Sequence, residues 1–359
     1  MNIAIRVDAS SSIGMGHLMR CITLAELFKR HMNAKVSFLL NRLAPMTIVE
    51  WLDEGGFRLL RMNSDITDSN DYKVDADCSL ELLKTCGEID WLIVDHYLLD
   101  YRWETILLSR VGKLFVIDDL ANRRHNCHIL LDQNLSSDMN EKYSGLLPEH
   151  CMQLLGPGYT LLREQFYVMK NRRSFRKSCK NILVSFGGSD PTNETSKVVS
   201  VLRILASQFP RLKFIVLGGV SNSRNNELEG LCSTIPSITF HKHNSHMAQI
   251  LSQVDLAVGA GGISLWERAY MGVPSIVITV ADNQLDAVQE AERMGMIWYL
   301  GKSEQVTEHN ILDGLLSVIS DERVIVDVSV KCLSVMDAFN KTSIHPILTV
   351  IANHTINRW

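Results

Sequence analysis

The feature that most constrains this chain is the regular alternation of short apolar runs with segments of helical periodicity. In the first half, β-type runs are predicted at residues 3–8, 35–40, 57–61, 91–95, 113–117 and 129–131. The first, fourth and fifth runs are almost continuously apolar, which is typical of strands covered on both faces. Between the first two runs, residues 17–30 place their apolar side chains on one helical face. This alternation predicts an α/β fold with a parallel sheet and right-handed crossovers.

The second half repeats the plan, so the 359 residues suit two doubly wound, Rossmann-like domains. Its expected strands are KNILVSFGG, LKFIVLGG, SITFH, VDLAVGAGG and VPSIVITV, and its expected helices lie at 194–207, 247–253, 263–271 and 284–294. Residues 171–180 are polar and basic and are interpreted as a linker. We therefore expect domains at 1–170 and 181–345 and a tail at 346–359 that has no assigned role. Such sheets bind ligands at the carboxyl ends of their strands, so two facing sheets predict a cleft between domains.

Composition excludes several classes of partner. Net charge is −4, with 36 basic and 40 acidic residues and no basic block, so no nucleic-acid partner is expected. The N-terminus lacks the pattern of a signal peptide, and no apolar run approaches the roughly 18 residues of a membrane span. The eight cysteines form no CxxC pair and are expected to be buried hydrophobes. We expect a cytoplasmic monomer without metal, cofactor or membrane partner.

Three glycine-rich turns stand where a strand is expected to run into a helix. They are DASSSIGMGH with Gly14 and Gly16, SFGGSDPTN with Gly187 and Gly188, and GAGGISLWE with Gly261 and Gly262. Glycine permits positive φ and close ligand approach, and the N–H groups that begin a helix favour phosphate. Together the turns indicate a diphosphate ligand, although a tight turn alone would also require glycine. Met19 breaks the GxGxxG dinucleotide pattern, and no GxxxxGK[ST] motif occurs.

His17 is the most informative single residue, because it follows a glycine in the expected first turn of a helix. The positive helix end disfavours imidazolium, so we expect a neutral ring that can accept a proton. The alternative is a capping or surface histidine.

Two other patterns of polar residues give weaker evidence of a site. His241, His243 and His246 have no carboxylate or thiolate to complete a zinc site, and we expect uracil contacts near 241–244 through main-chain groups. Asp118 and Asp119 are adjacent rather than spaced as in DxD.

Taken together, SSSIGMGHLMRC, IVDHY, VIDD, LREQFY, SFGGSD and GAGGISLWERAYMGVPSIVI resemble a known family over residues 3 to 300 or so. This family comprises the UDP-2,4-diacetamido-2,4,6-trideoxy-β-L-altropyranose hydrolases of pseudaminic acid synthesis. The second half also resembles the UDP-GlcNAc transferase of peptidoglycan synthesis. The resemblance implies a GT-B fold and attack by water at the anomeric carbon with inversion.

The resemblance also implies roles for individual residues. His17 matches the catalytic histidine, and Glu267 matches a glutamate that binds ribose. The nucleotide site is expected to comprise Gly187, Gly188, Ser189, Gly261, Gly262, Ile263, Ser264, Glu267, Asn283 and Gln284. The sugar pocket is expected to comprise Gly14, Gly16, Asp95, His96, Tyr97 and Asp119.

This chemistry suits the residue types. UDP is a weak base and leaves without a general acid, so two helix N-termini could stabilise the developing charge. Attack needs only a base near a water, and either Asp8 or Asp95 could orient His17. Two alternatives are a glycosyltransferase that uses an acceptor hydroxyl in place of water, and a binding protein without catalysis. His17 argues against a binding protein, because binding alone does not require a base at this position.

Overall fold

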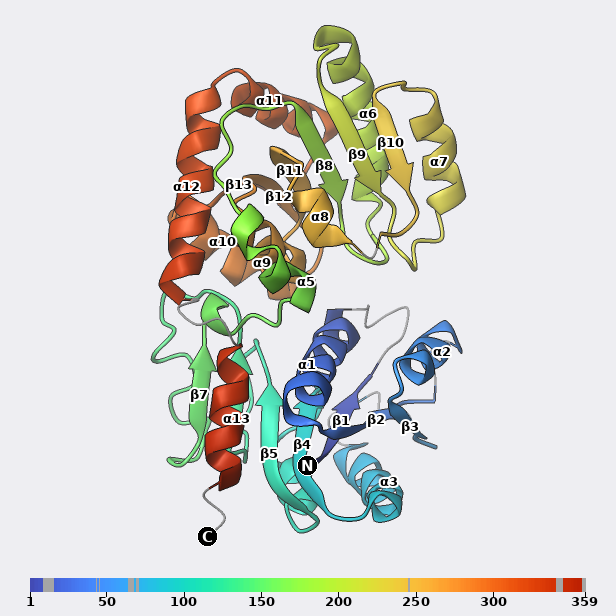
Figure 1. Ribbon diagram of the computed structural model, residues 1–359, viewed down its shortest axis with the longest axis vertical. Coiled ribbons are helices and arrows are strands. Elements are labelled where there is room, and N and C mark those ends of the chain that lie inside the picture. Colours follow the sequence, from blue (N-terminus) through green and yellow to red (C-terminus); the bar gives the residue numbers. More distant parts are fainter. Residues whose placement is uncertain are drawn as a thin grey trace. The chain divides into compact units, whose positions relative to one another are not determined.

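The computed structural model describes residues 1–8, 16–42, 44, 46–63, 68, 71–244, 246–339 and 345–356. Gly14, one of the predicted sugar-pocket residues, lies outside this part of the chain. The chain divides into two compact units, residues 1–161 with 342–359 (unit 1) and residues 162–341 (unit 2). Each unit is a parallel sheet with helices on its faces (Figure 1).

Unit 1 contains a seven-stranded sheet in the order β3-β2-β1-β4-β5-β6-β7. Its strands are β1 (Asn2–Val7), β2 (Lys35–Leu40), β3 (Arg58–Arg61), β4 (Ile89–Asp95), β5 (Val111–Ile117), β6 (Ile129–Asp132) and β7 (Met152–Leu155). Its helices are α1 (Gly16–Met32), α2 (Met46–Glu54), α3 (Tyr72–Leu83), α4 (Tyr101–Leu107) and α13 (Pro346–Ile356), with short helices η2 (Lys84–Cys86) and η3 (Pro157–Tyr159). The strand β7 was not anticipated from the sequence.

Strand β1 shows why these runs are apolar throughout. Alternate side chains of a strand point to opposite faces. Ile3, Ile5 and Val7 join the core beneath α1 and α13, whereas Ala4 joins the core beneath α3 and α4. Both faces are covered, so every position of the strand after Asn2 is buried and the period-two alternation is lost.

Unit 2 contains a six-stranded parallel sheet in the order β10-β9-β8-β11-β12-β13. Its strands are β8 (Asn181–Ser185), β9 (Lys213–Leu217), β10 (Ile238–His241), β11 (Leu256–Ala260), β12 (Ser275–Thr279) and β13 (Ile297–Lys302). Its helices are α5 (Glu164–Val168), α6 (Glu194–Gln208), α7 (Asn225–Ser233), α8 (Met247–Leu251), α9 (Ile263–Tyr270), α10 (Leu285–Arg293), α11 (Glu308–Ile319) and α12 (Glu322–Phe339), with η4 (Lys170–Arg172) and η5 (Asp282–Gln284).

The unit boundaries differ from the domains expected from the sequence. Residues 162–170 were expected in the first domain and belong to unit 2, whereas the tail at 346–359 returns to unit 1. The segment interpreted as a linker is held within unit 2. Buried Arg176 donates to the carbonyls of Leu251 and Val254 at 2.7 and 2.6 Å. A polar, basic segment is therefore ordered here by main-chain acceptors that its sequence could not reveal.

Strand order reverses once in each sheet, between β1 and β4 in unit 1 and between β8 and β11 in unit 2. At such a switch point the connections leave in opposite directions and open a crevice at the carboxyl ends of the strands. Most of the predicted site residues lie at the carboxyl ends of these four strands, and Asp119, Asn283 and Gln284 follow the neighbouring strands β5 and β12. No helix in the described part of the chain is long and apolar enough to cross a membrane.

Candidate functional site

In unit 1, the carboxyl ends of β1, β4 and β5 bring His17, Asp95, Tyr97 and Asp119 together. His17 is the second residue of α1, and its Nδ1 lies 2.6 Å from Oδ1 of Asp95, the last residue of β4. The imidazole of His17 also packs edge-on against the Tyr97 ring, with 4.6 Å between centroids. Tyr97 donates to Asp119, which follows β5, at 2.8 Å. The catalytic candidate His17 and three of the residues predicted for the sugar pocket therefore form one cluster, the His17 cluster, in which two hydrogen-bonded pairs are joined by a ring contact.

Asp95 is the carboxylate that contacts His17, which decides between the two candidates left open by the sequence. Asp8 is engaged elsewhere, in an ion pair with Arg6 and a 3.0 Å contact with Nε2 of His96. The main-chain N–H of Leu98 donates to Nδ1 of His96 at 3.1 Å, so the His96 proton resides on Nε2 and points to Asp8. His96 is thus buried in a structural chain of contacts and is not part of the His17 cluster.

The charge on Asp95 is stabilised despite its burial. Burial alone would raise the pKa of this carboxyl, but the neighbouring Arg20 and His17 hold the pKa well below its usual range. Arg20 donates to Asp95 from Nε at 2.5 Å and from Nη2 at 2.6 Å, and it donates to Asp119 at 3.2 Å. Arg20 was not among the residues predicted from the sequence. Its spacing of three residues from His17 in an expected helix was the available signal, since i and i+3 share a face.

The adjacent aspartates after β5 have separate functions. Asp119 belongs to the His17 cluster, whereas buried Asp118 pairs with Arg123 at 2.7 Å and accepts from Tyr143. No group of three or more His, Cys, Asp or Glu side chains suited to a metal ion occurs among the described residues.

In unit 2, the first glycine turn follows β8 and exposes its main chain. Gly187 has φ of +88° and is exposed, so the requirement for glycine there is conformational. Gly219, at the end of β9, has φ of +99°, and a Cβ atom there would lie 2.5 Å from the carbonyl oxygens of Gly187 and Gly188. The two turns therefore pack closely, and the turn at 187–189 is held in shape by its neighbour.

The α6 N-terminus is met by a side chain that precedes the helix. Asp190 lies between the glycine turn and the helix, and its carboxylate accepts from the N–H groups of Glu194 and Thr195, both at 2.9 Å. Of the two helix N-termini expected to stabilise a diphosphate, the one of α6 is therefore already capped by a carboxylate. For α6 the expectation stays a prediction, because its first two N–H groups already have Asp190 as an acceptor, whereas the main chain at 187–189 lies just after β8.

The second glycine turn connects β11 to α9, with Gly262 as the residue that precedes the helix. A Cβ atom at Gly261 would lie 2.2 Å from Val288 of α10, so packing requires glycine at this position. Gln284 accepts from the N–H groups of Gly261 and Val280 at 3.1 and 3.2 Å. The predicted ligand residue Gln284 thus ties the β11 and β12 turns together, and its neighbour Asn283 is exposed.

Glu267 and Ser264 lie on α9 and each has an arginine partner. Arg163, which precedes α5, donates to Oε1 of Glu267 from Nε and Nη2 at 3.2 and 3.0 Å. Arg268 donates to the Ser264 hydroxyl at 3.1 Å. Arg163 was not among the residues predicted from the sequence, although it lies in LREQFY, one of the motifs that carry the resemblance.

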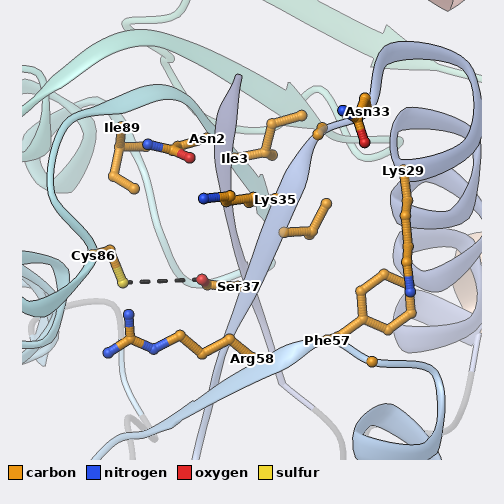
Figure 2. Close-up of a pocket in the computed structure, with 13 residues that line it drawn as sticks. Asn2, Ile3, Lys29, Asn33, Lys35, Ser37, Phe57, Arg58, Cys86 and Ile89 are labelled. Atoms are coloured by element: carbon orange, nitrogen blue, oxygen red, sulfur yellow. Dashed lines mark hydrogen bonds between the residues drawn. The ribbon is translucent and has the colours of Figure 1, made fainter.

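A cavity of about 440 Å³ lies at the amino ends of the unit 1 strands, opposite the carboxyl ends that carry His17 (Figure 2). It is lined from the amino ends of β1, β2 and β4, with Lys29, Lys35 and Arg58 among its side chains. None of the residues predicted to act in binding or catalysis lines it, so it is separate from the His17 cluster.

Comparisons with known proteins agree with this architecture. The chain is similar to the structure of MurG from Acinetobacter baumannii, with a TM-score of 0.63 at 12% identity over 95% of this chain and 99% of that one. It is also similar to the UDP-GlcNAc 2-epimerase of Neisseria meningitidis bound to UDP-GlcNAc, with a TM-score of 0.58 at 12% identity over 99% of each chain. Two parallel sheets in this arrangement make the chain a GT-B protein.

Several known proteins match the chain in sequence, and two of them show how far the similarity extends. An uncharacterized protein of Methanocaldococcus jannaschii is 29% identical over 290 residues, which are 77% of this chain and 55% of that protein. The UDP-2,4-diacetamido-2,4,6-trideoxy-β-L-altropyranose hydrolase of Campylobacter jejuni is 25% identical over 256 residues, or 70% of this chain and 82% of the hydrolase. The chain thus spans little more than half of the archaeal relative. No protein-family model matches it.

Proposed function

We propose that this protein is a nucleotide-sugar hydrolase that removes UDP from UDP-2,4-diacetamido-2,4,6-trideoxy-β-L-altropyranose, with His17 as the general base. The observation that carries the proposal is the 2.6 Å contact between Nδ1 of His17 and the ionised Asp95. A carboxylate at Nδ1 orients the ring and leaves Nε2 as the proton acceptor. The similarity to the C. jejuni hydrolase supports the choice of substrate.

In the proposed reaction, a water oxygen forms a bond to the anomeric carbon as its proton passes to Nε2 of His17. The bond between that carbon and the diphosphate oxygen breaks, and its electron pair leaves with UDP. No acid is needed, because the diphosphate is a stable leaving group. The sugar is released with inverted configuration, and the proton is then lost from His17 to solvent.

Unit 2 is proposed to bind the nucleotide. Exposed main chain at 187–189 and the first residues of α9 would meet the diphosphate, since helix N–H groups favour phosphate. Glu267 would accept the ribose hydroxyls. Asp190 already caps α6, so of these two helices only α9 would donate N–H groups to the diphosphate.

The test is hydrolysis of the UDP-trideoxy sugar in H₂¹⁸O without any acceptor. Mass spectrometry should find UDP without label, which reports attack at carbon; label in the free sugar is not diagnostic, because a free sugar also exchanges its anomeric oxygen with water. Label in UDP would mean cleavage of the P–O bond and would refute the mechanism. No turnover until an acceptor alcohol is added would instead identify a glycosyltransferase.

A further inference from the structure

Arg20 binds both oxygens of Asp95, the carboxylate that contacts His17. Its Nε donates to Oδ2 at 2.5 Å and its Nη2 to Oδ1 at 2.6 Å, so the guanidinium and carboxylate pair in the two-pronged geometry that fixes both groups. Arg20 is 6% exposed, and its Nη1 reaches Asp119 at 3.2 Å. This side chain is therefore held from two strand ends of the sheet.

The Arg20 side chain also bears on the protonation of His17. Nη2 of Arg20 lies 3.0 Å from Nδ1 of His17, while Oδ1 of Asp95 lies 2.6 Å from the same nitrogen. Arginine only donates hydrogen bonds, so two protonation states of the His17 Nδ1 are compatible with these contacts. It can carry a proton and donate to Asp95, or it can accept from Arg20 and leave the proton on Nε2. A lone pair facing the carboxylate at 2.6 Å would be repelled, so the first choice is favoured.

We propose that Arg20 is a positioning residue, which clamps Asp95 so that the Nδ1 proton of His17 stays on the carboxylate side and Nε2 stays free to take a proton. This inference rests on the proposed function for its catalytic meaning, but its effect on the imidazole is independent of any substrate. Without Arg20, Asp95 would lose the partner that fixes both of its oxygens.

Removal of Arg20 would also change the electrostatic charge around His17. Asp95 from β4, Arg20 from α1, Tyr97 after β4 and, through them, Asp119 after β5 surround the ring. Loss of the guanidinium would leave two carboxylates without their cation and stabilise imidazolium. The base would then remain protonated to higher pH, and the acidic limb of the rate profile would move upward.

The experiment compares Arg20→Met and Arg20→Lys with the wild type. Arg30→Gln is the matched control, because it removes an exposed arginine from the far end of the same helix. NMR of ¹⁵N-labelled histidine reports the His17 tautomer and its titration without substrate, with His17→Asn to assign the signal. The pH profile of kcat/KM is measured in parallel, and circular dichroism with thermal melting confirms folding.

For Arg20→Met we expect kcat/KM to fall about 10²-fold, within the range for partners that orient a functional group. The acidic limb of the kcat/KM profile should move to higher pH, and the His17 signals in the NMR spectrum should change. Arg20→Lys should recover part of the charge effect but not the paired geometry. An unchanged His17 spectrum in folded Arg20→Met overturns the inference. If the wild type hydrolyses no UDP-sugar, the proposed function fails while the NMR arm still decides the effect of Arg20.

Discussion

The residues at the carboxyl ends of the strands are of different kinds in the two sheets. In unit 1 the switch point gathers ionised and aromatic side chains, namely His17, Arg20, Asp95, Tyr97 and Asp119. In unit 2 the corresponding residues are mostly glycines. Positive φ requires glycine at position 187, and close packing requires it at positions 219 and 261. Under the proposed function, unit 1 would supply the proton chemistry and unit 2 would supply main-chain groups that bind the nucleotide, and this proposal is called here the division between the units. Four substitutions would break or sharpen this division.

The largest effect is expected from His17→Asn, which removes the base while nearly preserving size. Turnover of the UDP-sugar should fall about 10³-fold, since general bases contribute on the order of 10² to 10⁴. UDP affinity, measured by calorimetry, should stay within about twofold of wild type. A comparable loss of UDP binding would contradict the division between the units.

Asp95→Asn is expected to lower kcat about 10²-fold, because the amide cannot hold the Nδ1 proton of His17 in the same way. It also leaves Arg20 buried beside a neutral group, which should cost about 3 kcal/mol of unfolding free energy at pH 7. Kinetics and urea unfolding measure the two effects. Normal kcat in a folded protein would show that His17 needs no carboxylate.

The same variant gives a pH test. The pKa of Asp95 is lowered in the folded state, so its contribution to stability is present above about pH 4 and is lost as pH falls further. The unfolding free energy of wild type should therefore decline more steeply between pH 5 and pH 3 than that of Asp95→Asn. Parallel slopes would mean that Asp95 is not the ionised partner described here.

Gly219→Ala tests the main-chain edge of unit 2. A Cβ atom would meet the carbonyls of Gly187 and Gly188 at 2.5 Å and would sit at φ of +99°. We expect a loss of about 2 kcal/mol in unfolding free energy and a roughly tenfold rise in KM. Gly230→Ala is the control, because it lies in α7 with no atom within 4 Å of the new Cβ and should raise stability slightly.

The smallest effect is expected from Glu267→Gln, which weakens a proposed contact with the ribose. UDP affinity should fall several-fold, up to about tenfold, with little change in kcat at saturation. The difference should vanish for a uridine nucleotide without ribose hydroxyls. Exposed Glu308→Gln serves as the control. A large drop in kcat would place Glu267 in the chemistry and blur the contrast between the two units.

Much of this organisation could be predicted from the sequence, because continuous apolar runs and glycine turns report local geometry. The α/β class and GT-B fold are confirmed, and the strand ends placed His17, Asp95, Tyr97 and Asp119 near one another. Partners that depend on tertiary contacts were missed. Arg163 reaches Glu267 from 104 residues away, and Asp190 caps a helix that was expected to meet phosphate. No sequence spacing reveals the partnership of Arg163, whereas Asp190 lies only four residues before Glu194, so an acidic residue just ahead of the helix was a local signal for its cap.

The return of the chain to its first unit has a consequence for biosynthesis. Ile347, Leu348 and Ile351 of α13 are buried in the same core as α1 and β1, and His345 contacts the carbonyl of Thr160 at 3.0 Å. A ribosome delivers these residues only after all of unit 2 has emerged. The strands and most helices of unit 2 are therefore synthesised before unit 1 receives the helix that closes its core. Fragments that stop at residue 341 should therefore expose an apolar groove and depend on chaperones.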